Sequence, residues 1–139
     1  PNTYGKEKAG YVCGSLMVDH ASKKIFNYCQ LSTQAADTLE SKHHLESLAK
    51  EEGFTIKKYH FDNGIFSSKA FKDDCDRQSQ KYSFSGISAK FQNGVAERNI
   101  QTIVRWARAN LLHAVRHWPA HVRMTLWPFA MHYAVWVYN

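Results

Sequence analysis

The spacing of hydrophobic and polar positions in the first third of the chain predicts a β-hairpin followed by a helix. Apolar and aromatic residues dominate 11–18 (YVCGSLMV) and 24–31 (KIFNYCQL), and the turn-forming sequence DHASK lies between them. From Thr33 to Glu52 the spacing becomes helical. The expected apolar side holds Ala36, Leu39, His43, Leu45 and Leu48, and the expected polar side holds Asp37, Glu40, Lys42 and Glu46. Gly53 is typical of a helix end.

The middle of the chain predicts a strand, a helix and a second strand. Residues 55–61 (TIKKYHF) alternate as a strand should, and Asp62-Asn63-Gly64 ends that strand with residues that favour turns. A short helix is expected over 68–78 and a strand over 81–85. Asp62 is therefore expected at the carboxyl end of a strand.

Two helices are predicted in the last third. The first runs from about 93 to 115, and its buried stripe consists of Ile100, Ile103, Ala107, Leu111 and Ala114. The second starts near Thr125, after Pro119. The residues expected to face the core from this helix are Trp127, Ala130 or Met131, Ala134 and Val137. Other aromatics in this helix, such as Trp136, fit a core better than a subunit interface. No repeat or long linker divides the chain, so one domain over 1–139 is expected.

Composition narrows the classes of partner. The chain has 139 residues and a formal net charge of +6, which favours an anionic partner, most often nucleic acid. Three widely spaced cysteines without a C-x-x-C pair indicate neither a disulfide framework nor a zinc knuckle, and they fit an intracellular compartment. The apolar run over 124–138 is too short to span a membrane and contains a proline and a histidine, so no membrane partner is expected.

The histidines at 113, 117 and 121 are spaced so that they could share one side of a helix. Pro119 interrupts that helix, and no cysteine lies nearby to complete a zinc site. Solvated histidines at a helix end are therefore favoured over zinc binding.

Two acidic motifs are the strongest indication of chemistry. They are FDNGIF, which contains Asp62, and QNGVAERN, which contains Glu97. A strand end and a helix wall can hold two carboxylates rigidly enough to bind paired Mg²⁺ or Mn²⁺ ions for phosphoryl transfer, a site that usually needs a third carboxylate. Each acid also has a simpler interpretation: Asp62 as a turn residue, and Glu97 as a first-turn acid favoured by the helix dipole.

Basic and polar residues accompany Glu97 on the same helix. At about 100° per residue, Gln101, Arg105 and Arg108 lie within roughly 80° of the glutamate. A solvated helix face is the alternative to a DNA-binding surface. The candidates for nucleic-acid contact, mainly to phosphates, are Lys90, Gln92, Asn93, Arg98, Gln101, Arg105 and Arg108.

These motifs also carry a resemblance. FDNGIF, then QNGVAERNIQTIVRWARANLL, then the closing LWPFAMHYAVWVYN resemble the integrase catalytic core of LTR retrotransposons, nearest the Ty1/copia-type group. The resemblance implies an α/β fold with a ribonuclease H-like mixed sheet flanked by helices. It also implies a divalent-metal polynucleotidyl transferase that joins retroelement cDNA ends to target DNA in the nucleus, and a homo-oligomer at full length. Asp62 and Glu97 would be the second and third acids of its Asp-Asp-Glu triad.

The resemblance places the family's first acid upstream of Pro1, on the first, central strand of the sheet. The chain is then expected to be an N-terminally truncated core that lacks this strand, is poorly stable alone and is inactive by itself. Asp19 is expected to be a turn residue and not a metal ligand. The alternatives are a non-catalytic DNA-binding module of the same fold, decayed or domesticated, and another ribonuclease H-like transposase or nuclease.

Overall fold

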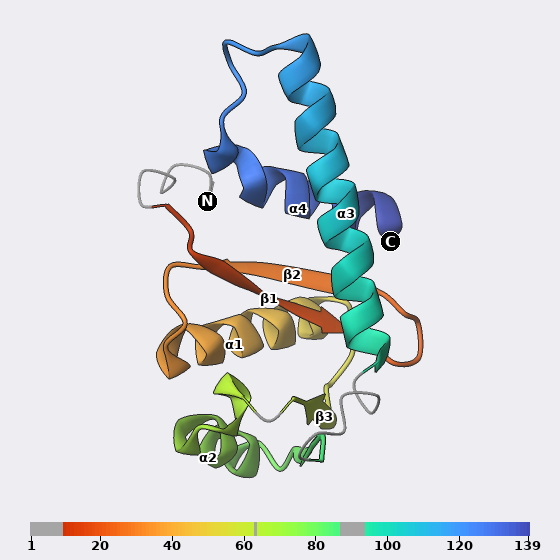
Figure 1. Cartoon of the computed structure of the whole chain (residues 1–139). Coiled ribbons are helices and arrows are strands. Elements are labelled where there is room, and N and C mark those ends of the chain that lie inside the picture. Colours follow the sequence, from red (N-terminus) through yellow and green to blue (C-terminus); the bar gives the residue numbers. More distant parts are fainter. Residues whose placement is uncertain (1–9, 63, 87–93) are drawn as a thin grey trace. The chain divides into compact units, whose positions relative to one another are not determined.

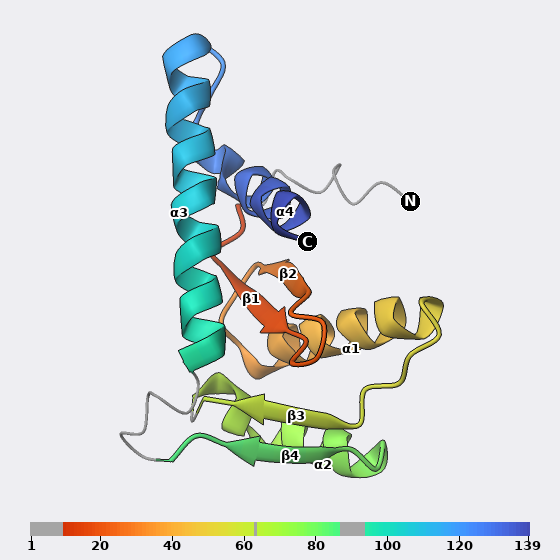
Figure 2. The same ribbon diagram turned by 90° about the vertical axis from the view of Figure 1, so that its right-hand side faces the viewer.

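The computed structural model describes residues 10–62, 64–86 and 94–139, and the chain divides into two compact units. The first unit contains 10–29 together with Ala96–Asn139, and the second contains Gln30–Val95. Figures 1 and 2 show the helices and strands of each unit.

The first unit begins with the predicted hairpin, formed by β1 (Cys13–Val18) and β2 (Ile25–Gln30), whose last residue belongs to the second unit. The backbone N–H of Asp19 donates to the Lys24 carbonyl at 2.9 Å. Its carboxylate accepts from the backbone N–H of Ser22 at 2.8 Å and from the Ser22 hydroxyl at 2.6 Å. These bonds lower the pKa of Asp19. The prediction that Asp19 is a turn residue is therefore confirmed.

Two helices complete the first unit: α3 (Gly94–His117) and α4 (Trp127–Tyr138), the latter preceded by the 3₁₀ turn η4 (Met124–Leu126). Their buried side chains form one hydrophobic cluster with β2, namely Ile25, Ile103, Ala107, Ala130, Ala134 and Val135. The side-chain amide of Asn139 donates to the Ile25 carbonyl and accepts from the Ile25 N–H, both at 2.8 Å. The end of α4 is thus hydrogen-bonded to the start of β2.

The buried faces of these helices differ in part from the predicted ones. Ile100 and Val137 were expected in the core, but they are 42% and 49% exposed, and Val135 is buried instead. Trp136 was also expected in the core and is 75% exposed. Almost every position of α4 is apolar, so the sequence pattern could not show which side is buried. Among the described residues, no helix is both long and apolar enough to cross a membrane.

The second unit is a helix followed by a strand–helix–strand unit. Its elements are α1 (Ala35–Glu51), β3 (Lys58–Phe61), the 3₁₀ turn η2 (Ile65–Ser67), α2 (Lys69–Arg77) and β4 (Lys81–Phe84). β3 and β4 are parallel, with Phe61 opposite Phe84. Gly53, at φ +82°, follows α1 as predicted. The side chain of Ser68 accepts from the Phe71 N–H at 3.4 Å and caps α2.

Aromatic rings fill the space between β3 and α2. Phe61 stacks on Phe66 with ring centroids 4.7 Å apart and meets the edge of Phe71 at 4.9 Å. Tyr59, two residues earlier on the same face of β3, stacks on Phe61 at 5.2 Å. Phe71 is 1% exposed. This packing fixes the last residue of β3, which directly precedes Asp62.

The buried face of α1 differs in part from the predicted one, although Leu45 is buried as expected. Ala36 and His43 are exposed, and the buried residues are Thr38, Ser41, Lys42 and Leu45. Lys42, assigned to the polar outer side, is 0% exposed. An apolar pattern cannot locate a helix face that is buried through ion pairs and hydrogen bonds, which is the case here.

Each sheet of the described residues has only two strands, ordered β1-β2 and β3-β4. Within the parts of the chain that the structure describes, no third strand pairs with either. Two-stranded sheets have little stability of their own, so each relies on the helices packed against it.

Candidate functional site

Asp62 lies immediately after β3, and its side chain is exposed. Hydrogen bonds fix the backbone on both sides of Asp62. The Phe61 carbonyl accepts hydrogen bonds from the Ser85 N–H at 2.8 Å and from the Ser85 hydroxyl at 3.3 Å. The Asp62 carbonyl accepts from the Gly64 N–H at 2.9 Å. The position expected from the sequence, at the carboxyl end of a strand, is therefore confirmed.

Polar side chains gather along β3 and β4 near the same end. His60 contacts Ser83, directly opposite it in the register, with Nδ1 and Oγ 2.9 Å apart. Its Nε2 lies 3.4 Å from the Ser85 hydroxyl. Ligands of open α/β sheets bind outside the carboxyl ends of parallel strands, so this edge is suited to a site. Sequence reasoning did not single out His60, although the alternation of Tyr59, His60 and Phe61 placed it opposite the buried aromatics.

Glu97 lies in the first turn of α3 and is exposed. Its negative charge is favourable there because the first turn carries the positive end of the helix dipole. The buried side of α3 holds Ile103 and Ala107. The predicted DNA-contacting residues on α3 are all exposed, namely Arg98, Gln101, Arg105 and Arg108. The helix therefore presents a polar, mostly basic side to solvent.

The two predicted metal ligands belong to different units, Asp62 to the second and Glu97 to the first. Each is placed by its own element as expected, and their union in one site stays a prediction. Three of the predicted DNA contacts, Lys90, Gln92 and Asn93, lie outside the described residues.

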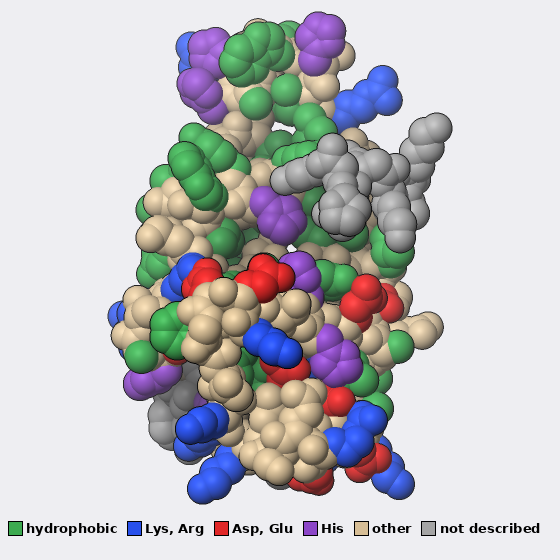
Figure 3. Space-filling view, turned by 180° about the vertical axis from the view of Figure 1, so that it is seen from behind, with side chains coloured by type: hydrophobic (Ala, Val, Ile, Leu, Met, Phe, Trp, Pro, Cys, Tyr) green, Lys and Arg blue, Asp and Glu red, His purple; other side chains and the backbone are tan. Residues whose placement is uncertain are grey.

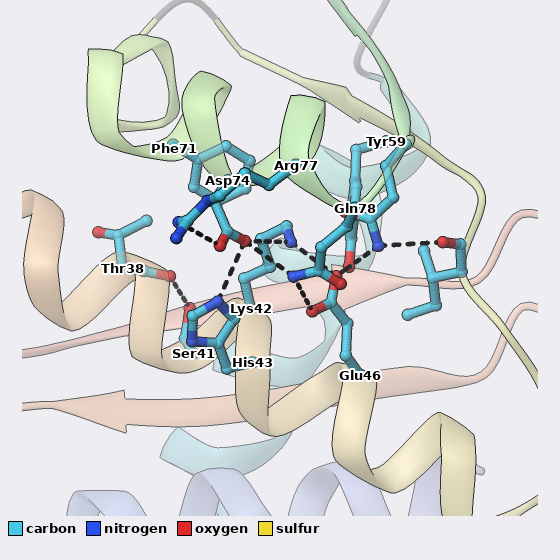
Figure 4. A network of polar contacts seen from close by, with 12 residues as sticks. Thr38, Ser41, Lys42, His43, Glu46, Tyr59, Phe71, Asp74, Arg77 and Gln78 are labelled. Atoms are coloured by element: carbon cyan, nitrogen blue, oxygen red, sulfur yellow. Dashed lines mark hydrogen bonds and ion pairs between the residues drawn. The ribbon is translucent and has the colours of Figure 1, made fainter.

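A buried polar network lies inside the second unit (Figure 4). Lys42 Nζ, from α1, is 2.7 Å from both Asp74 Oδ2 and Glu46 Oε1. Asp74, on α2, also contacts His43 Nε2 at 3.0 Å and accepts from Arg77 at 2.9 Å. The Lys42 ammonium lies 5.5 Å from the Tyr59 ring centre and 5.8 Å from that of Phe71. The network joins α1, α2 and β3.

Glu46 extends this network toward the strands. Its carboxylate accepts from the Tyr59 hydroxyl at 2.9 Å and from the Gln80 amide at 2.7 Å. Gln80 also donates to the Ile56 carbonyl at 3.1 Å. The segments that lead into β3 and β4 are thereby tied to α1.

The network changes the acidity of its members. Burial alone would raise the pKa of Asp74, but hydrogen bonds from Lys42 and His43 outweigh it and leave that pKa below its usual value. The pKa of Glu46 is lowered in the same way, burial being outweighed by hydrogen bonds from Lys42, Gln80 and Tyr59. Burial, together with the Glu46 charge, raises the pKa of Tyr59 far above its usual range. The carboxylates of Asp74 and Glu46 are therefore ionised at neutral pH.

His43, Glu46 and Asp74 could be taken for a metal site, because one ligand atom of each lies within 4.8 Å of the others. The Lys42 ammonium already lies 2.7 Å from a carboxylate oxygen of each acid. A divalent cation beside it would meet strong repulsion. These residues therefore stabilise the second unit, and the exposed carboxylates of Asp62 and Glu97 remain the better oxygen donors for Mg²⁺ or Mn²⁺.

The described elements form a mixed α/β fold with small sheets flanked by helices, the ribonuclease H-like fold of integrase catalytic cores. The chain is similar to the HTLV-2 integrase catalytic core domain solved with magnesium. Against its trimeric form the identity is 23% and the TM-score 0.67, over 91% of this chain and 73% of that one. The dimeric form gives the same identity and TM-score, over 91% and 74%.

A third solved structure has a similar fold in one of its chains. It is the simian T-cell lymphotropic virus intasome in complex with a regulatory subunit of PP2A, with 16% identity and a TM-score of 0.68, over 91% of this chain and 46% of that one. No protein-family model matches the chain, and no curated protein matches it. The comparisons thus establish the fold.

Proposed function

We propose that the chain is part of a catalytic core, of the LTR-retrotransposon type that its motifs resemble, and that the complete core joins retroelement cDNA 3′ ends to target DNA. One observation carries the proposal most. Asp62 lies at the carboxyl end of a parallel strand pair, in a fold shared with integrase catalytic cores. Glu97 lies in the first turn of α3, on which Arg98, Arg105 and Arg108 are exposed.

In this proposal Asp62 and Glu97 act through their carboxylate oxygens. Both side chains are exposed and therefore accessible to a hydrated ion. Carboxylates are the donors that Mg²⁺ and Mn²⁺ prefer, so the residues present fit these ions. When bound, the ions would activate a water or a DNA 3′-hydroxyl as nucleophile and stabilise the leaving oxygen. The aromatic packing beneath Asp62 and the long helix that carries Glu97 would hold the two acids rigidly.

The exposed side of α3 would hold the DNA through its phosphates. Arg98, Arg105 and Arg108 supply positive charge, and Gln101 lies among them on the helix surface. Phosphate contacts position a duplex without reading its sequence, so little base selectivity is expected. The complete core would join cDNA to target DNA in the nucleus.

We also propose that the described acids are two of a triad. The first acid would then come from outside this chain, and the isolated chain would bind DNA without joining it. Self-association belongs to the same proposal, since the HTLV-2 cores were solved in dimeric and trimeric forms and α4 leaves Trp136 75% exposed.

Strand transfer by a protein in which this chain is joined to a segment that supplies the proposed first acid tests the function. The expected result is joining of a labelled cDNA-end duplex to plasmid DNA with Mg²⁺ or Mn²⁺, and its loss in Asp62→Asn and Glu97→Gln. Asp73→Asn, at an exposed position on α2, is the matched control and should retain activity. Full activity of either acid variant would show that the site assignment is wrong.

A further inference from the structure

Two histidines near the end of α3 lie in direct contact. His113 and His117 are one helical turn apart, both side chains are exposed, and their Nε2 atoms are 3.1 Å apart. Their ring centres are 4.4 Å apart. In Figure 3 some histidine side chains, in purple, lie at the top of the view, and others lie scattered over the rest of that face. The exposure agrees with the predicted solvated histidines at a helix end, and the contact between the two rings adds to that prediction.

The Nε2–Nε2 distance matches that of two ligands on one metal ion. Histidine nitrogens bind zinc at about 2.0–2.1 Å, so two of them are about 2.9 Å apart at a right angle and about 3.3 Å apart at a tetrahedral angle. The observed 3.1 Å lies between these values. The distance alone is therefore compatible with both nitrogens binding one metal ion.

The surroundings of the pair also suit a cation. His113 and His117 lie in the last two turns of α3, where the negative end of the helix dipole favours positive charge. Trp118 lies beside His117, with ring centres 5.7 Å apart. The turn that follows is closed by a hydrogen bond from the His121 N–H to the Trp118 carbonyl at 3.0 Å. The two histidines thus lie in the last turns of a regular helix that ends at His117.

We propose that His113 and His117 chelate a divalent transition-metal ion such as Zn²⁺, Ni²⁺ or Cu²⁺ through their Nε2 atoms. Imidazole suits these ions, whereas Mg²⁺ and Mn²⁺ prefer oxygen ligands. Two protein ligands leave the remaining positions of the ion to water or to a group from another molecule. The site is independent of the carboxylates proposed for phosphoryl transfer.

Calorimetric titration of the whole chain with ZnCl₂ or NiCl₂, in a buffer that does not bind metal, tests this proposal. We expect one site, unaffected by millimolar Mg²⁺. Because each variant removes one arm of the chelate, His113→Ala and His117→Ala should each weaken binding by roughly tenfold or more. His121→Ala should retain the affinity. Circular dichroism would show that α3 still forms in each variant.

Two further readouts identify the ligands. Long-range ¹H–¹⁵N spectra should show the Nε2 signals of His113 and His117 shifting with Zn²⁺ and returning with EDTA. The double variant Asp62→Asn, Glu97→Gln should bind Zn²⁺ as tightly as the unmodified chain, which separates this site from the proposed catalytic one. Unchanged affinity in His113→Ala or His117→Ala, or no binding by the unmodified chain, would overturn the proposal.

Discussion

Lys42 Nζ lies 2.7 Å from Asp74 Oδ2, and both side chains are buried, one on α1 and the other on α2. A buried ammonium is tolerated only when its charge is matched, and here two carboxylates and two aromatic rings surround it. Since α2 and Tyr59 of β3 share this network, the pair helps to hold the strand that ends immediately before Asp62.

Replacing Lys42 with methionine should therefore destabilise the second unit. The variant removes the ammonium between Asp74 and Glu46. Because Arg77 and His43 still contact Asp74, the cost should lie below the about 3–5 kcal/mol of an uncompensated buried charge. That loss should weaken the β3–β4 pairing, seen by NMR as weaker contacts between the rings of Phe61 and Phe84.

The matched control is Lys50→Met, on the exposed side of the same helix. It removes the same charge and should leave those contacts intact. Equal effects of the two substitutions would show that the buried pair has no special role.

Lowering the pH should reduce the stability of the second unit. Asp74 and Glu46 have lowered pKa values in the folded chain. Their interactions therefore stabilise the fold fully above the usual values of about 3.9 and 4.3, and this stabilisation is lost as pH falls through the lower, folded values. The urea midpoint, followed by NMR signals of Phe61 and Phe71, should drop below about pH 4. In Asp74→Asn the drop should be smaller, and an unchanged pH dependence would contradict the assignment.

Much of the fold could be predicted because its elements carry clear periodic patterns. The alternation of 55–61 predicted β3, and the position of Asp62 at its end followed directly. The burial of Lys42 could not be predicted, since its partner Asp74 is distant in sequence and contacts it only once α1 packs on α2. The contact between His113 and His117 depends on rotamers, which spacing alone does not fix.

The arginines of α3 should govern how DNA binding depends on salt. Each phosphate contact that is lost should reduce the slope of log K against log salt concentration by about 0.9. The double variant Arg105→Gln, Arg108→Gln loses two such contacts. It should therefore lower the slope by about twice that amount, as measured by fluorescence anisotropy with a DNA duplex. Lys50→Gln, on α1, should leave it unchanged. If the double variant has the same salt dependence as the unmodified chain, this side of α3 is solvated and does not contact DNA.

Trp136 should promote self-association. It is 75% exposed and stacks on Tyr133, which is 53% exposed, so α4 presents contiguous apolar surface. Sedimentation equilibrium of Trp136→Ser should show weaker association than the unmodified chain. Trp118→Ser, at another exposed tryptophan outside α4, should have little effect. Equal association in all three proteins would exclude this surface as the interface.

The central claim is that Asp62 and Glu97, in different units of the chain, bind the same divalent ions. Paramagnetic relaxation by Mn²⁺ tests it most directly on the 139-residue chain. The account predicts that substoichiometric Mn²⁺ broadens the amide signals next to Asp62 and next to Glu97 together, and that Asp62→Asn or Glu97→Gln removes both effects. Broadening at only one of the two acids, or only near His43, Glu46 and Asp74, would contradict it.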